Sequence, residues 1–117
     1  MHRNASLIAT ISFVVAALTC HAIADPAIKI LIPSDDNCAA YVTAMNSDDR
    51  AAMLSLGGWA LGYWSALAEQ SGKDLLRDAS SEALLDKLAT LCQAQPNTPM
   101  SSIVETIGRE LLAGQAL

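Results

Sequence analysis

Eighteen consecutive residues, from Ala51 to Ala68, carry no charge, and this run constrains the fold more than any other part of the chain. It contains both tryptophans and three of the six glycines. Its length touches the lower limit for a membrane-spanning helix, but serine, glycine and alanine dilute the run. We therefore expect a central bundle helix from about Asp48 to Gln70, and a transmembrane helix is the less favoured alternative.

Small residues recur every four positions in this run, at Gly58, Gly62 and Ala66. On a helix this spacing places them on one face, where another helix can approach closely. Glycine inside a helix lowers stability by about 1 kcal/mol relative to alanine. We therefore expect another helix to pack against this face. An internal contact is favoured over a dimer seam. Trp59 and Tyr63, also four residues apart, are expected to stack beside this face.

The segment before the central run predicts an arm followed by a helix. Residues 25–33 form a short apolar stretch bracketed by prolines, and we expect an arm packed on the bundle rather than an edge strand. Ser34 is expected to cap the helix, with Asp35 and Asp36 in its first turn, where carboxylates favour the positive end of the helix dipole. Ser47 is expected to cap the central helix.

Two amphipathic helices are predicted after the central run. Ser80 or Ser81 is expected to cap the first, whose apolar stripe ends in Cys92. Thr98, followed by proline, is expected to start the second, and Gly114 to end it. The two apolar stripes comprise Leu84, Leu88, Leu91 and Cys92 in the first helix, and Met100, Ile103, Val104, Ile107 and Leu111 in the second.

The first 24 residues have the features of a secretory signal. His2 and Arg3 form a short basic start, an apolar core follows, and residues 22–24 make a small-x-small cleavage site. A permanent N-terminal anchor is the less favoured alternative. We therefore expect export to the periplasm, no membrane span after signal removal, and a single domain over residues 25–117.

Two cysteines, Cys38 and Cys92, remain once the signal and Cys20 are removed. In an exported chain, an even pair of cysteines indicates a disulfide. A bridge between these positions would contribute about 4 kcal/mol in the chain-entropy model, a large share for a domain of this size. The predicted fold is a small all-α, four-helix orthogonal bundle with one disulfide.

The expected mature chain offers little for catalysis. Both histidines, His2 and His21, leave with the signal, which removes the usual general base and the commonest metal ligand. Cysteines in a disulfide provide no thiolate. Two pairs of adjacent aspartates are better explained as helix-start residues than as catalytic acids. We expect no enzyme, no metal and no cofactor.

The charge of the mature chain points to protein partners. Loss of Arg3 lowers the basic count from 7 to 6 against 12 acidic residues, a net charge of −6. An acidic surface without a basic run argues against binding to nucleic acid or to anionic membranes. The expected protein-binding or packing surface comprises Trp59, Gly62, Tyr63, Trp64 and Leu67, and for the aromatic residues core packing is favoured.

Several of these residues resemble the HdeA/HdeB-type periplasmic acid-stress chaperones, over about residues 38–112. The similarity rests on two cysteines, a Trp-x-x-Gly-Tyr motif, a Cys-x-x-x-Pro motif and a final amphipathic helix; the motif residues are Cys38, Trp59, Gly62, Tyr63, Cys92 and Pro96. The resemblance implies a small helical domain that is a homodimer at neutral pH. Acid would dissociate and partly unfold it, and the exposed apolar surface would then bind acid-denatured proteins.

The charge pattern is compatible with such an acid response. Protonation of all carboxylates would change the net charge from −6 to about +6. Carboxylates at helix starts stabilise the fold only while they are charged. The candidates for this role are Asp35, Asp36, Asp48 and Asp49.

A second family also resembles this chain. The immunity proteins that block type VI secretion amidase effectors are small, exported, disulfide-bearing and built around a Gly-Tyr helix, here Gly62-Tyr63. They usually carry further cysteines, including one near the C-terminus, whereas this chain ends Ala-Gly-Gln-Ala-Leu. An inhibitor of a cell-wall amidase is therefore the alternative function, and an envelope structural protein is a third.

Overall fold

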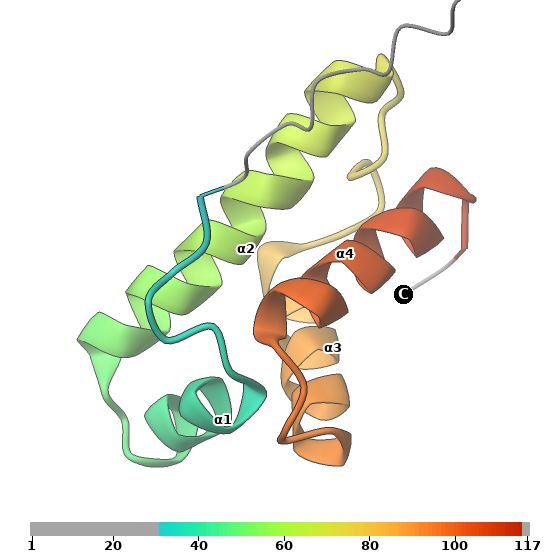
Figure 1. The fold of residues 1–117 in the computed structure, drawn as a ribbon. Helices are drawn as coiled ribbons and strands as arrows, with labels where there is room; N and C mark the ends of the chain where they lie inside the picture. The colour runs from blue at the N-terminus through green and yellow to red at the C-terminus, as the bar shows by residue number, and fades with distance from the viewer. Residues whose placement is uncertain (1–30, 116–117) are drawn as a thin grey trace, which may run out of the picture.

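The computed structural model describes residues 31–115 of the chain, and this part contains four α-helices (Figure 1). They are α1 (Cys38–Asn46), α2 (Arg50–Ser71), α3 (Ser81–Ala94) and α4 (Met100–Leu112). This confirms the predicted all-α, four-helix fold. The predicted signal, residues 1–24, and residues 25–30 of the predicted arm lie outside the described residues.

The central helix α2 begins and ends close to where the uncharged run predicts. Asp49 caps its start, because the carboxylate accepts a hydrogen bond from the Ala52 N–H at 3.1 Å. Gly72 ends it with φ 63°, the left-handed conformation that glycine adopts readily. Ser47, the expected cap, instead ends α1, where its hydroxyl donates to the carbonyl of Thr43 at 2.7 Å.

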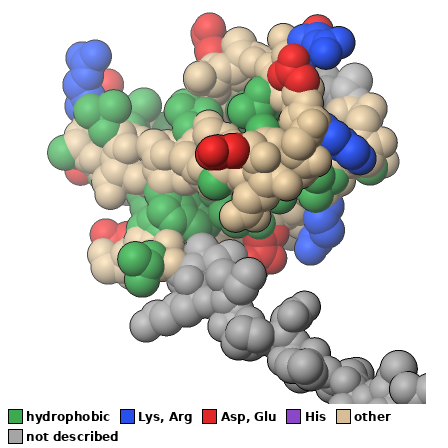
Figure 2. Space-filling model, turned by 90° about the horizontal axis from the view of Figure 1, so that it is seen from above, with side chains coloured by type: hydrophobic (Ala, Val, Ile, Leu, Met, Phe, Trp, Pro, Cys, Tyr) green, Lys and Arg blue, Asp and Glu red, His purple; other side chains and the backbone are tan. Residues whose placement is uncertain are grey.

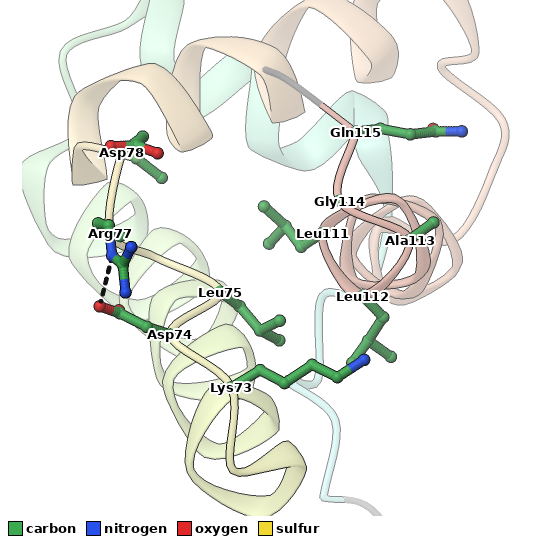
Figure 3. A pocket seen from close by; sticks show the side chains of 11 residues that line it. Lys73, Asp74, Leu75, Arg77, Asp78, Leu111, Leu112, Ala113, Gly114 and Gln115 are labelled. Carbon is green, nitrogen blue, oxygen red and sulfur yellow. Dashed lines mark hydrogen bonds and ion pairs between the residues drawn. The ribbon is translucent and has the colours of Figure 1, made fainter.

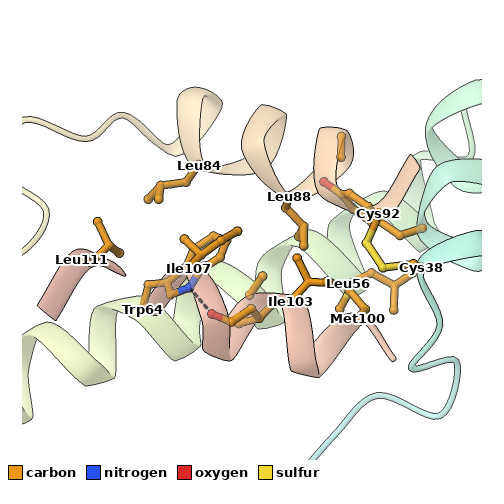
Figure 4. Packing of buried hydrophobic residues seen from close by; sticks show 14 residues of the cluster. Cys38, Leu56, Trp64, Leu84, Leu88, Cys92, Met100, Ile103, Ile107 and Leu111 are labelled. Carbon is orange, nitrogen blue, oxygen red and sulfur yellow. Dashed lines mark hydrogen bonds between the residues drawn. A yellow bond between two sulfur atoms is a disulfide. The ribbon is translucent and has the colours of Figure 1, made fainter. Parts of the chain in front are cut away.

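All four helices contribute to the core, with Cys38 and Tyr41 from α1 and the other buried residues from α2, α3 and α4 (Figure 4). Helices α2 and α4 run side by side in the same direction, and α3 runs opposite to them. The apolar face of α2 that points inward has a spacing of four residues, at Leu56, Ala60 and Trp64. No helix within residues 31–115 has the length and apolar character needed to cross a membrane.

The predicted disulfide is present at one end of this core. Cys38 at the start of α1 is bonded to Cys92 near the end of α3, with the two Cα atoms 4.7 Å apart and both residues fully buried. Backbone hydrogen bonds strengthen this junction, because the Cys38 N–H donates to the Thr98 carbonyl and the Ala39 N–H to the Pro96 carbonyl, each at 3.1 Å. The start of α1 is thus tied to the turn between α3 and α4.

The expected start of α1 is wrong by three residues. Asn37, not Ser34, caps the helix, and its side-chain oxygen accepts the Ala39 N–H at 2.7 Å. Asp35 and Asp36 therefore precede α1 instead of lying in its first turn. The reason is tertiary, because the Asp36 carboxylate is bonded to another helix.

The boundaries of the last two helices are mostly as predicted. Ser80 caps α3 by accepting the Ala83 N–H at 3.0 Å, and Gly114 follows α4 with φ 72°. Thr98 does not cap α4, contrary to expectation: Pro99 has an extended ψ of 132°, so the helix starts one residue later, and none of its own residues supplies a cap hydrogen bond.

Removal of the disulfide by the double substitution Cys38→Ala and Cys92→Ala should lower the free energy of unfolding by up to about 4 kcal/mol. The bridge closes a loop between residues 54 positions apart, which restricts the unfolded chain. Urea unfolding of the variant and of the oxidised protein measures the difference, and reduction of the parent protein is the matched control. A difference below about 1 kcal/mol would show that the bridge does not stabilise the fold in this way.

Candidate functional site

Helix α4 closes the core with a strongly amphipathic face. Met100, Val104 and Ile107 are fully buried, and Ile103 and Leu111 are nearly so. On the opposite side, charged residues face the solvent. α4 therefore covers the largest apolar cluster of residues 31–115, and the groups that hold it in place decide whether that cluster stays covered.

The first of these groups is Asp36, which caps α4 from outside the helix. One carboxylate oxygen accepts the backbone N–H of Ser101 at 2.7 Å, and the other accepts the Ser101 hydroxyl at 2.6 Å. Ser101 is only 8% exposed, so this contact is largely shielded from water. A carboxylate here satisfies a free N–H group and favours the positive end of the helix dipole.

The second group is an ion pair near the other end of α4. Lys87 Nζ of α3 lies 2.7 Å from Glu110 Oε2, and the two side chains are 25% and 31% exposed. The Glu110 Oε2 atom is itself buried and has no hydrogen-bond partner within residues 31–115 other than this ion-pair contact. Loss of the pair would leave an ammonium group against the core edge, which is costly for a partly buried charge.

The structure separates the five residues that were expected to form one surface. Trp64 is fully buried, and its indole N–H donates to the Val104 carbonyl of α4 at 3.0 Å (Figure 4). Tyr63 and Leu67 are half-buried and face Gly108 of α4; a Cβ atom on Gly108 would lie 3.4 Å from the tyrosine ring and 3.0 Å from a leucine methyl carbon. These three residues therefore form part of the seat of α4.

The other two residues have different surroundings. Trp59 is half-buried, and its ring centroid lies 5.8 Å from that of Tyr63, which confirms the predicted stacking. Its indole N–H donates to the Leu31 carbonyl at 2.7 Å, so the predicted arm does contact the bundle at this point. Gly62 is exposed to solvent.

The expected internal contact at Gly58, Gly62 and Ala66 is wrong for the described residues. All three are exposed, and no atom lies within 4 Å of a Cβ built on either glycine. The close helix contacts use Gly57 and Gly108. A Cβ atom on Gly57 would lie 3.3 Å from a methyl carbon of Leu85 in α3. The sequence offered two faces with a spacing of four, and it did not reveal which one points inward.

Apolar side chains also reach the surface near this face. Leu54 of α2 is 69% exposed, and Leu31 and Ile32 of the arm are 77% and 50% exposed. Figure 2 shows apolar groups at the surface between scattered charged ones. The exposed side of α2 is thus an uncharged surface in the folded protein.

A cleft of about 660 Å³ lies between residues 73–79 and the end of α4 (Figure 3). Leu75 and Leu111 point into it, and the Lys73 side chain extends across its mouth. Arg77 is paired with Asp74 at 3.1 Å. The cleft combines an apolar floor with charges of both signs. The sequence did not reveal it, because its walls are more than thirty residues apart in the chain.

Two tyrosines have raised pKa values, and these shifts do not alter stability between neutral and acid pH. Burial raises the pKa of Tyr41, and Asp86 raises it further. Burial also raises the pKa of Tyr63, as does Glu105, while Arg109 lowers it. A raised tyrosine pKa gives stability that is present at neutral and acid pH and is lost only as the pH rises above about 10. Both hydroxyls therefore stay neutral throughout the acid range.

Residues 31–115 contain no cluster of three or more His, Cys, Asp or Glu side chains arranged to bind a metal ion. Comparisons of the chain with protein-family models, with curated proteins and with solved structures find no significant match.

The contact between Asp36 and Ser101 can be measured by a double-mutant cycle. Asp36→Ala should lower the free energy of unfolding by about 2 kcal/mol, because it removes two hydrogen bonds to a charged group. Once Asp36 is gone, Ser101→Ala should cost little more, which gives a coupling energy of about 1–2 kcal/mol. Asp48→Asn is the comparison variant, because asparagine tolerates the positive φ of 55° at this position. Additive losses in urea unfolding would show that the two residues do not interact.

Alanine substitutions of glycines should have opposite effects on the two sides of the bundle. Gly58→Ala and Gly62→Ala should each raise the free energy of unfolding by up to about 1 kcal/mol, since no atom obstructs the new methyl group. Gly108→Ala should lower it by about 1 kcal/mol or more, because Leu67 must move. Denaturant midpoints check both signs, and a destabilised Gly62→Ala variant would mean that this face is covered.

Proposed function

We propose that this protein is a periplasmic acid-stress chaperone, a holdase that binds acid-denatured proteins through apolar surface exposed at low pH. The observation that carries the proposal is the way α4 is held. Its apolar face covers the core, and a carboxylate stabilises it near each end, through Asp36 with Ser101 and through Glu110 with Lys87. Few other polar contacts keep this helix in place.

Both contacts depend on a carboxylate. Asp36 accepts two hydrogen bonds from Ser101, and Glu110 forms the ion pair with Lys87, so neutralisation of either carboxylate would weaken the contacts that hold α4. The other titratable or charged groups on or facing α4 are Tyr63 of α2, Glu105 and Arg109 of α4, and Lys73, Asp74, Arg77 and Asp78 at the cleft.

Three further features support this function. The disulfide does not depend on pH, so α1 and α3 stay linked when α4 loosens. A chain with 6 basic residues outside the predicted signal becomes positively charged in acid, which keeps a partly unfolded protein soluble. The resemblance of Cys38, Cys92 and the Trp59–Tyr63 motif to the HdeA/HdeB-type chaperones implies the same activity.

The activity is tested by acid aggregation of a client enzyme. The purified chain from Asp25 onward is mixed with an aggregation-prone periplasmic enzyme, held at about pH 2, and returned to neutral pH while light scattering is recorded. We expect suppressed scattering, together with binding of a hydrophobic dye that appears only in acid. Asp36→Asn with Glu110→Gln should shift dye binding to higher pH, and Asp48→Asn should not. Unchanged scattering with a folded bundle at low pH would refute the chaperone activity.

The exposed face of α2 favours a second candidate, an inhibitor of a cell-wall amidase. Leu54, Gly58 and Gly62 present an uncharged surface at neutral pH, before any acid is added. An inhibitor would bind its amidase through this face without acid, so Gly62→Arg would abolish binding and Asp36→Asn would not. For a chaperone we expect Gly62→Arg to leave binding intact and Asp36→Asn to shift it to higher pH, because its binding surface lies beneath α4.

A further inference from the structure

The disulfide of residues 31–115 does not include α4. The Cys38–Cys92 bond joins α1 to α3, and α4 packs against α2 and α3 without a covalent cross-link. α4 is connected to the linked pair through the short turn between Ala94 and Met100. Its departure from the bundle would therefore leave the bond between α1 and α3 intact.

The departure of α4 would uncover an apolar groove between α2 and α3. Its floor consists of residues that are now fully or nearly buried, together with the half-buried pair that faces Gly108; they are Leu56, Ala60, Tyr63, Trp64, Leu67, Leu84 and Leu88. The groove is as long as the apolar stripe of α4, from Met100 to Leu111 (Figure 4). No charged side chain belongs to this floor.

One polar group in the groove has a specific requirement. The Trp64 indole N–H is buried and donates to the Val104 carbonyl of α4. When a bound segment replaces α4 and covers the groove again, this donor needs a new acceptor, because a buried N–H without a partner costs about 1–3 kcal/mol. A backbone carbonyl of any peptide segment meets that need regardless of its sequence. Gly108 shows how closely a backbone approaches here.

We propose that this groove, the seat of α4, is the client-binding site, and that it binds an amphipathic segment of an unfolded protein in place of α4. The inference rests on the proposed function. The preferred segment has apolar residues at the spacing of Met100, Val104 and Ile107 and forms a helix of about three turns. It fills the groove with apolar side chains and offers one carbonyl to Trp64.

The test uses α4 itself as the probe. A tetramethylrhodamine-labelled peptide of residues 98–113 is titrated with the chain from Asp25 onward, and fluorescence anisotropy is measured at neutral pH and at about pH 2. The apparent affinity scales with the fraction of molecules whose groove is open. We therefore expect at least about a tenfold rise in acid. The matched control is the same peptide with Ile107→Asp, which should bind poorly at both pH values.

Two further measurements locate the binding site. In a Trp59→Phe background Trp64 is the single tryptophan, so its emission should shift to the red when α4 leaves and back to the blue when the peptide binds. The double variant Asp36→Asn and Glu110→Gln should bind the peptide at a higher pH than the parent, whereas Asp48→Asn should not. Unlabelled peptide should also restore client scattering by competition.

The outcomes separate the inference from the function on which it rests. Suppression of client scattering without peptide binding in acid would overturn the groove as the client site and leave the chaperone activity intact. Peptide binding without suppression of scattering would refute the chaperone activity, and with it the assignment of the groove to clients. Peptide binding with competition, and with the Trp64 shift, supports both.

Discussion

The junction between α1 and the turn before α4 is the constraint on which the rest of the structure depends. A disulfide, two backbone hydrogen bonds and the Asp36 carboxylate all meet there. The covalent bond fixes where α1 and α3 cross, and Asp36, two residues before Cys38, is thereby brought to the first turn of α4. The disulfide thus positions a side chain that it does not itself contact.

The two ends of α4 are held by different means. At the first end, the cap by Asp36 lies next to a covalent link and is largely shielded from water. At the other end, Lys87 and Glu110 form a partly exposed ion pair beside an open cleft. The C-terminal end of α4 is therefore held more weakly than its N-terminal end. Opening is expected to begin at Leu111 and proceed toward Met100, which keeps the turn at Pro99 as the pivot.

Much of the fold follows from local patterns in the sequence. The buried stripe of α4, the left-handed residue Gly114 after it and the cap at Ser80 all depend on residues within a few positions of one another, and each is as predicted. The two cysteines outside the predicted signal allow a single disulfide pairing, which the structure contains. Such features are determined by helix geometry and residue chemistry alone.

The features that sequence reasoning missed are tertiary. Asp36 looks like a residue of its own helix, and only the folded chain shows that it caps a helix 65 positions away. Likewise, α2 has two faces of similar spacing, and the large ring of Trp64 on one of them decides which is buried. The sequence did not show which face of α2 points inward. It therefore could not separate the five residues of the expected surface into those beneath α4 and those in contact with solvent or the arm.

The bond between Cys38 and Cys92 also makes folding depend on the redox state of the surroundings. In a reducing compartment the thiols stay apart, and a chain of this size loses a large part of its stability. Such a chain spends more of its time unfolded. Oxidation of the two thiols completes the structure, so the same bond that frames the bundle also makes its formation depend on the redox state of the compartment.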